Sequence, residues 1–242
     1  MKKLSTIIVI ILFGLILYNN SAAQGKPKSP DSSTPSTKPT EQQFEEWADQ
    51  FTGDKLDETK WEKFTFAGGS GGRLEVKDGE VRIRSGNNTR AGIRSVKTFT
   101  GDRFIAEAHL AKVGAAYPEP GNNDAAVGFA NLTILFDGSG RNRVEWILNS
   151  NGNFEAWAVT DGRGERLDKL NLATKMKNPV LSIVRRGDEF LFVLNSAEGK
   201  PQDAQVGLST TVKNMPKSFR VMLYGYGSSE NNWDWARVVV AK

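Results

Sequence analysis

The sequence contains no cysteine in its 242 residues and a single histidine. Without cysteine there are no disulfides, no thiolate metal sites, no cysteine nucleophile and no lipid-modified cysteine of the kind found in bacterial lipoproteins. A lone histidine rules out a metal site built from several imidazoles. Folding must therefore rely on a hydrophobic core, and no cofactor is expected.

The chain also lacks an apolar run long enough to cross a membrane. The run from Ile7 to Leu17 is much shorter than the roughly 20 apolar residues that a spanning helix needs. It follows the basic Met1-Lys2-Lys3 and precedes Ser21-Ala22-Ala23, whose small residues suit a signal peptidase. We predict a cleaved signal peptide over residues 1–23, a secreted or periplasmic protein, and no membrane span after cleavage.

Residues 24–43 contain no apolar side chain and are rich in Pro, Ser, Thr and Lys, which predicts a flexible linker. The formal net charge of +4 also lies near this end of the chain. Lys2 and Lys3 supply half of it and residues 24–40 the other half, so residue 41 onward is neutral. A neutral domain has no electrostatic footprint for a polyanion such as nucleic acid, so no nucleic-acid partner is expected.

From residue 44 to 242 the sequence alternates apolar and polar residues in short runs, punctuated by Gly, Asn, Asp and Pro. Apart from a short helical turn at 41–49, this pattern favours strands throughout. We expect them near residues 62–66, 73–77, 80–84, 92–100, 103–112, 125–136, 142–149, 153–159, 180–186, 189–195, 218–226 and 233–240. Lys77–Glu80 and Arg185–Asp188 each place a glycine where a tight hairpin requires a positive φ angle. The pattern is typical of one all-β sandwich or barrel.

Three segments together resemble a known superfamily. They are Phe51–Trp61 (FTGDKLDETKW), the hairpin Leu181–Phe190 and Asn232–Val238 (NWDWARV). This layout resembles the concanavalin A-like lectin/glucanase superfamily, which includes laminarinase-like and laminin G-like domains. The resemblance implies a jelly-roll β-sandwich of two antiparallel sheets, with a concave face on which members bind, and sometimes cleave, polysaccharide.

The resemblance also implies two features that this sequence meets only in part. Hydrolytic members carry Glu-x-Asp-x-x-Glu on one concave strand, and the nearest strand here, Arg143–Asn149, holds only the carboxylate of Glu145. Some relatives hold a structural calcium near the paired termini, where Asp234 could be a ligand. Calcium takes six to eight oxygens, so the alternative is an aspartate that caps or pairs at the sheet edge.

The hairpin around Asn151-Gly152 can be read in two registers. A two-residue turn opposes Trp146 to Trp157, whereas a three-residue loop opposes Glu145 to Trp157. The second register turns an uninterrupted apolar set inward, namely Val144, Trp146, Leu148, Phe154, Ala156 and Ala158. We therefore prefer it, and it leaves Trp157 on the outer face.

Alternation in 103–112 turns Phe104, Ala106, Ala108 and Leu110 inward. If this strand and the central hairpin share one sheet, the outer residues line a single groove. These candidate ligand-binding residues are Glu107, His109, Arg143, Glu145, Glu155 and Trp157. A ring that stacks on a sugar, beside carboxylates and arginine that take its hydroxyls, is how sugar sites are built. The alternative is an ordinary polar outer face, on which His109 is a hydrogen-bonded surface residue.

The sequence therefore favours a monomeric, exported, non-catalytic carbohydrate-binding domain whose partner is a polysaccharide. The first alternative is a divergent glycoside hydrolase or lyase that uses Glu107, Glu145 or Glu155. The second is a structural or adhesive domain that contacts proteins, which predicts a flat outer face without a groove. Residues 117–124 and 224–232 are expected to be loops that could border the groove.

Overall fold

The computed structural model describes residues 43–66, 72–113, 129–148, 153–170, 178–196 and 206–242. The predicted signal peptide, residues 24–42 of the predicted linker and the predicted loop 117–124 lie outside the described residues. No helix long and apolar enough to span a membrane occurs in the described part.

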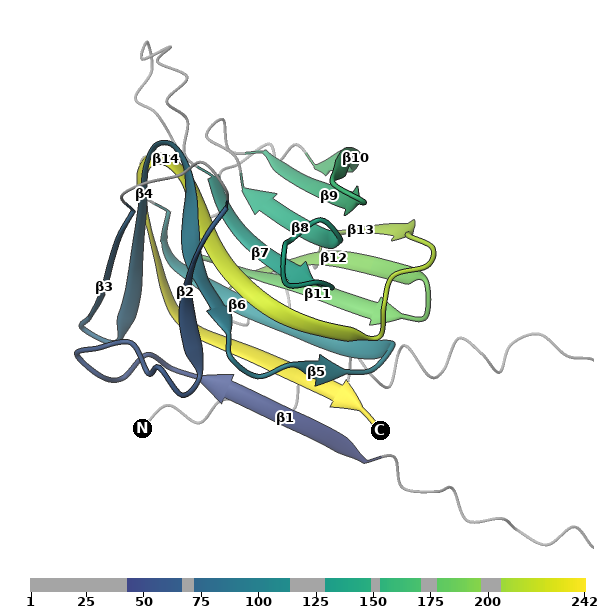
Figure 1. The fold of residues 1–242 in the computed structure, drawn as a ribbon, viewed down its shortest axis with the longest axis horizontal. Coiled ribbons are helices and arrows are strands. Elements are labelled where there is room, and N and C mark those ends of the chain that lie inside the picture. Colours follow the sequence, from purple (N-terminus) through teal and green to yellow (C-terminus); the bar gives the residue numbers. More distant parts are fainter. Residues whose placement is uncertain (1–42, 67–71, 114–128, 149–152, 171–177, 197–205) are drawn as a thin grey trace, which may run out of the picture. The chain divides into compact units, whose positions relative to one another are not determined.

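Every regular element of the described residues is a β-strand, and every strand pair is antiparallel (Figure 1). The strands are β1 (Phe44–Asp49), β2 (Trp61–Thr65), β3 (Arg73–Lys77), β4 (Glu80–Ser95), β5 (Phe99–Thr100), β6 (Arg103–Val113), β7 (Phe129–Leu135), β8 (Arg143–Leu148), β9 (Phe154–Thr160), β10 (Arg163–Leu170), β11 (Pro179–Arg186), β12 (Glu189–Ser196), β13 (Val206–Thr211) and β14 (Ser218–Ala241).

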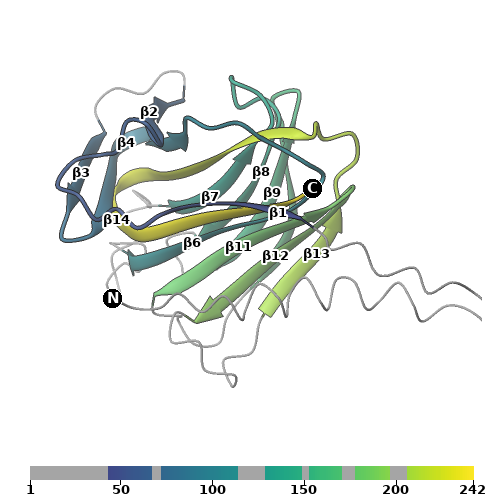
Figure 2. The ribbon, with the colours of Figure 1, turned by 90° about the horizontal axis from the view of Figure 1, so that it is seen from below.

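The strands form the two sheets of a jelly-roll sandwich, as predicted. We call the sheet built around β7, β8, β9 and β10 the first sheet; residues 218–226 of β14 and the second half of β4 extend it to β2. We call the sheet built around β6, β11, β12 and β13 the second sheet; residues 231–240 of β14 pair with β6 there. Figure 2 shows β14 crossing between the two groups of strands.

β14 replaces the two strands and the intervening loop 224–232 that the sequence predicted. It is one strand over residues 218–241, and its pairing with β4 shifts register on both sides of Gly227. Bulges of this kind bend a strand without ending it, so one strand serves both sheets. The glycine-rich sequence, which suggests a loop, marks this bend instead.

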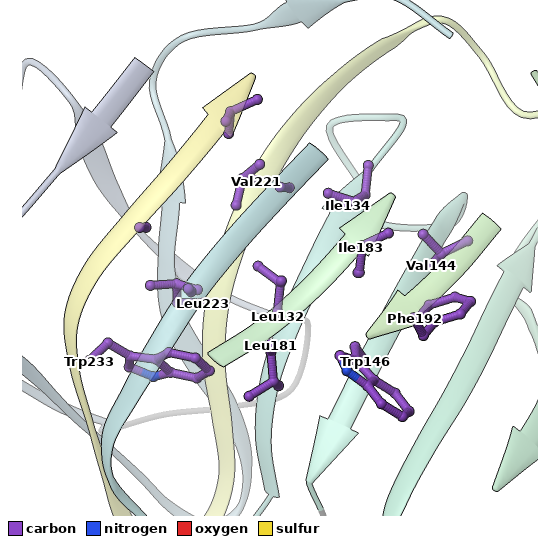
Figure 3. Close-up of a cluster of buried hydrophobic side chains, with 14 of the residues drawn as sticks. Leu132, Ile134, Val144, Trp146, Leu181, Ile183, Phe192, Val221, Leu223 and Trp233 are labelled. Carbon is purple, nitrogen blue, oxygen red and sulfur yellow. The ribbon is translucent and has the colours of Figure 1, made fainter. Parts of the chain in front are cut away.

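The core lies between the two sheets and follows the predicted alternation. Figure 3 shows Trp146 of β8 beside Phe192 of β12, with further side chains from both sheets. Ala106 and Ala108 of β6 belong to the same buried cluster. Glu145 pairs with Trp157, so the preferred register of the central hairpin is confirmed.

Three strands escaped prediction. Residues 44–49, expected as a helical turn, form β1, which pairs with the end of β14; its Trp47 packs edge-on against Trp61 at 5.1 Å between ring centroids. β10 and β13 were missed because each lies at the edge of the strand order and carries few apolar residues. By contrast, Gly79 and Gly187 have φ of 77° and 63°, which confirms both predicted hairpins.

Candidate functional site

The turn between β7 and β8 sets up one end of the candidate site. The Asp137 carboxylate accepts hydrogen bonds from the backbone N–H of Ser139, Arg141 and Asn142 at 2.9, 3.0 and 2.7 Å. Gly140, at a φ of 75°, completes the turn. Its carbonyl accepts a hydrogen bond from the guanidinium of Arg143, so the turn fixes the first side chain of β8.

Arg143, Glu145 and Tyr224 form a buried network on the outer face of the first sheet. Arg143 Nε donates to Glu145 Oε1 at 2.7 Å, and the Tyr224 hydroxyl donates to the same oxygen at 2.6 Å. All three residues are at most 9% exposed. Burial, followed by the charge of Glu145, raises the pKa of Tyr224 well above its ordinary value, so its hydroxyl stays protonated and donating. The network is therefore rigid and preorganised.

Trp157 and Glu155 lie on the same face, one strand further along. Trp157 Nε1 donates to Glu155 Oε2 at 2.9 Å, and Arg166 of β10 lies 3.6 Å from the other oxygen of that carboxylate. Gly164 of β10 borders the indole: a Cβ placed there would stand 3.9 Å from the ring. Since Gly164 has no side chain, this edge of the indole stays open.

These side chains surround a pocket of about 410 Å³. Its floor includes the apolar Ile147 and Val159. The lining residues are Arg90, Arg143, Glu145, Ile147, Glu155, Trp157, Val159, Gly162, Gly164 and Tyr224. An aromatic ring, aliphatic floor and fixed hydrogen-bonding groups around one cavity suit a ligand that is apolar on its faces and polar at its rim.

Four of the six predicted site residues, Arg143, Glu145, Glu155 and Trp157, line this pocket. The expectation of one groove that also holds Glu107 and His109 is wrong. β6 pairs with β11 and β14, not with the central hairpin, so it belongs to the second sheet. Its Ala106 and Ala108 face the shared core, and Glu107 and His109 therefore point away from it on the opposite side of the sandwich.

Glu107 and His109 take part in a separate polar cluster. Glu107 forms an ion pair with Arg237 and accepts a hydrogen bond from Ser182 at 3.0 Å. The His109 ring lies 2.6 Å from Asp234 through Nδ1 and stacks near Trp235 at 6.0 Å between centroids. These contacts give both side chains structural partners.

Asp234 was the predicted calcium ligand. Its carboxylate oxygen Oδ1 lies against His109, and Asp234 follows Trp233 where the pairing of β14 with β6 shifts register. Within the described ranges, no group of three or more His, Cys, Asp or Glu side chains could hold a metal. Calcium at this position stays a prediction.

Sequence reasoning missed Tyr224 and Arg90. Tyr224 was placed where the predicted strand 218–226 overlaps the predicted loop 224–232. Val221 and Leu223 of the same strand face the core, so alternation from them would have turned Tyr224 outward. Arg90 lies opposite Tyr226 in the β4–β14 pair. Neighbouring Asn131 and Thr133 of β7 share this face, and their side-chain polar atoms are buried without a hydrogen-bond partner among the described residues.

Acidic pH should lower the stability of the fold by protonating Asp137, which holds together the turn before Arg143. Burial alone raises the pKa of Asp137, but hydrogen bonds from Ser139, Asn142 and Arg141 outweigh it and lower the pKa below 3.8. A carboxyl with a depressed folded pKa contributes stability above its unfolded pKa and loses it as the pH falls through the folded value. We expect Asp137→Asn to lose less stability than the wild type between about pH 6 and about pH 3.

Urea unfolding midpoints at the two pH values measure this difference. The other carboxylates are common to both proteins and cancel in the comparison. Equal losses in both proteins would contradict the assigned role of Asp137.

No protein-family model and no curated protein sequence matches the chain. Several solved structures match its fold. The CBM2 module of the evolved Dit of Lactobacillus casei BL23 phage J-1 matches with a TM-score of 0.59 and 12% identity over 84% of this chain and 98% of that one. SCLam, a non-specific endo-β-1,3(4)-glucanase from family GH16, matches with a TM-score of 0.58 and 12% identity over 82% and 92% of the two chains.

Basic winged bean lectin, solved with Tn-antigen, matches with a TM-score of 0.58 and 8% identity over 82% of this chain and 99% of that one. At such identities the likeness concerns the fold alone. Both the glucanases of family GH16 and the legume lectins are concanavalin A-like jelly rolls. The protein therefore has the concanavalin A-like jelly-roll fold that its three sequence segments predicted.

Proposed function

We propose that this is an exported carbohydrate-binding protein that holds a polysaccharide on the outer face of the first sheet without cleaving it. The observation that carries the proposal is the 410 Å³ pocket, in which a half-buried tryptophan stands beside a fixed Arg143–Glu145–Tyr224 network. An indole stacks on the apolar face of a pyranose, while carboxylate and guanidinium groups bind its hydroxyls. A pocket of this kind supports glycan binding over the flat face that a purely structural domain would present.

The span of the pocket favours a chain of sugars over a single sugar. Arg90 on β4 and Trp157 on β9 both line it, and β14, β7 and β8 lie between these strands. Four inter-strand steps of about 4.8 Å separate the two residues by roughly 19 Å. Both side chains reach into this gap, and we expect a ligand that contacts both to be longer than a single sugar ring.

The carboxylates support binding without hydrolysis. Glu107 lies on the opposite side of the sandwich and cannot pair with the others. Glu145 and Glu155 are diagonal neighbours on adjacent strands, a separation compatible with a glycosidase pair. Oε1 of Glu145, however, already accepts hydrogen bonds from Arg143 and Tyr224, so this oxygen is committed to holding the site together.

A panel of polysaccharides tests the proposal. Full-length protein is titrated with laminarin, dextran, polygalacturonate and dextran sulfate, and reducing ends are measured in parallel. Saturable binding without new reducing ends is the expected result. Absence of binding to every member would overturn the proposal. Hydrolysis of a polysaccharide that is lost in the Glu145→Gln variant and also in the Glu155→Gln variant would overturn it as well. For export, the mature protein recovered outside the cytoplasm should begin at Gln24.

A side chain at Gly164 should close the pocket without disturbing the fold. A Cβ at this position would have ordinary contacts, 3.8 Å to Val159 and 3.9 Å to Trp157. A leucine should therefore fold normally but occupy the space beside the indole. We expect Gly164→Leu to weaken polysaccharide binding by about tenfold or more, since stacking residues contribute roughly 1–3 kcal/mol.

Gly138→Leu is the matched control, because a Cβ there would meet nothing within 4 Å and Gly138 does not line the pocket. Equal affinities of Gly164→Leu, Gly138→Leu and the wild type would place the ligand elsewhere.

A further inference from the structure

Among the described residues, the outer face of the first sheet carries more arginines than carboxylates that could pair with them. Arg143 is paired with Glu145, and Arg166 lies 3.6 Å from Glu155. A third carboxylate, Glu62, serves two arginines.

Glu62 lies on β2, next to β4, and therefore at the opposite end of the sheet from β9 and β10. Arg94 Nε and Arg220 Nη1 both lie 2.6 Å from the same oxygen of Glu62. The hydrogen bond from Arg94 is the main cause that lowers the pKa of Glu62; burial opposes it, and the charges of Arg94 and Arg220 lower the pKa further. Glu62 therefore carries one negative charge against two positive ones, and this end of the face keeps a net positive charge.

Arg90 adds a second positive charge, and this one lines the pocket itself. Its side chain is exposed, and its guanidinium lies over the Tyr226 ring at 5.7 Å from the centroid. No carboxylate of the described residues lies within 4.0 Å of it. A guanidinium that rests on a ring keeps its N–H groups free at the edge, where they can form two parallel bonds to a planar anion.

From this charge pattern we infer that the polysaccharide is acidic, bearing carboxylate or sulfate groups, and that Arg90 binds one of them. The inference rests on the proposed function and names the ligand class of the same site. Its basis is local: the residues from 41 onward are neutral as a whole, while the described residues of this face include more arginines than carboxylates. A neutral glycan would leave the free guanidinium without a charged partner.

Two matched pairs of polysaccharides separate charge from shape. Polygalacturonate is compared with its fully methyl-esterified form, and dextran sulfate with dextran, so the carboxylate and sulfate sources are tested separately. We expect at least one acidic member to bind about tenfold or more tightly than its neutral partner, because a charge-assisted hydrogen bond is stronger than a neutral one. That preference should shrink as salt rises from about 0.05 to about 0.5 M.

Arg90→Gln should remove most of the preference, because it weakens binding of the acidic member far more than binding of its neutral partner. The control is Arg73→Gln, which removes an exposed arginine of β3 that does not line the pocket. Gly164→Leu serves as a second control, because binding of the acidic polymer through lysines elsewhere in the full chain would survive it. Thermal unfolding of each variant shows that it is folded.

The outcomes distinguish this inference from the proposed function. Equal or tighter binding of the neutral member in both pairs would overturn the inference and leave the proposed function standing. An acidic preference that Arg90→Gln does not reduce would remove the role of Arg90. Binding of laminarin with none of these four polymers bound would overturn the inference alone. Absence of binding to laminarin and to all four polymers would contradict the proposed function and the inference together.

Discussion

Trp146→Ala is expected to lower the free energy of unfolding by about 3–5 kcal/mol, because it removes a fully buried indole from between the two sheets. The ring lies 5.5 Å from Phe154 and 5.7 Å from Phe192, measured between centroids. Its Nε1–H donates to the carbonyl of Val193 on β12 at 3.0 Å. The substitution therefore opens a cavity and removes a hydrogen bond that joins the sheets.

Guanidinium unfolding of the full-length protein measures this loss. Trp146→Phe is the control, since it retains an aromatic ring and should cost less than the alanine variant. A loss below about 1 kcal/mol for Trp146→Ala, within the range of exposed positions, would contradict its place in the core.

Trp157→Ala should have the reverse profile: little effect on folding and a large effect on binding. Trp157 is half-buried on the outer face and contacts Glu155 and the open position at Gly164. Its removal exposes a sheet surface but leaves the core intact, so we expect a stability loss of about 1 kcal/mol or less. Polysaccharide affinity should fall by roughly 10- to 100-fold, the order of an aromatic hot spot.

Trp157→Phe supplies the control, because a smaller ring retains part of the stacking surface and should recover part of the affinity. Unchanged affinity in Trp157→Ala would remove the indole from the site. A stability loss in Trp157→Ala that exceeds the loss in Trp146→Ala would mean that the two faces of the hairpin are exchanged.

The sequence predicted correctly which face each side chain of the central hairpin occupies. Alternation is a local property of a strand, and only one register of Glu145 and Trp157 gives an uninterrupted apolar face. The same alternation correctly turned Ala106 and Ala108 inward. These results depend on neighbouring residues alone, so they can be obtained without tertiary information.

What local pattern could not supply is which strands share a sheet. β6 pairs with the end of β14, more than a hundred residues later in the chain, and this long-range pairing places Glu107 and His109 on the second sheet. Tyr224 was missed for a related reason: the glycines that follow it suggest a loop, whereas pairing with β7 and β4 continues the strand. Edge strands such as β10 escaped because solvent-exposed strands need few apolar residues.

The central claim is that a polysaccharide lies on the first sheet over Trp157, and the indole N–H resonances of the six tryptophans report on it directly. Trp157→Phe, Trp235→Phe and Trp146→Phe each assign one of these signals, so the outer face of each sheet and the core between them carry a probe. Oligogalacturonate and laminari-oligosaccharides are titrated separately into the full-length protein. We predict that at least one of them shifts the Trp157 signal while the Trp235 and Trp146 signals stay in place. A shift at Trp235 with Trp157 unmoved, or no shift at Trp157 with either sugar, would contradict the claim.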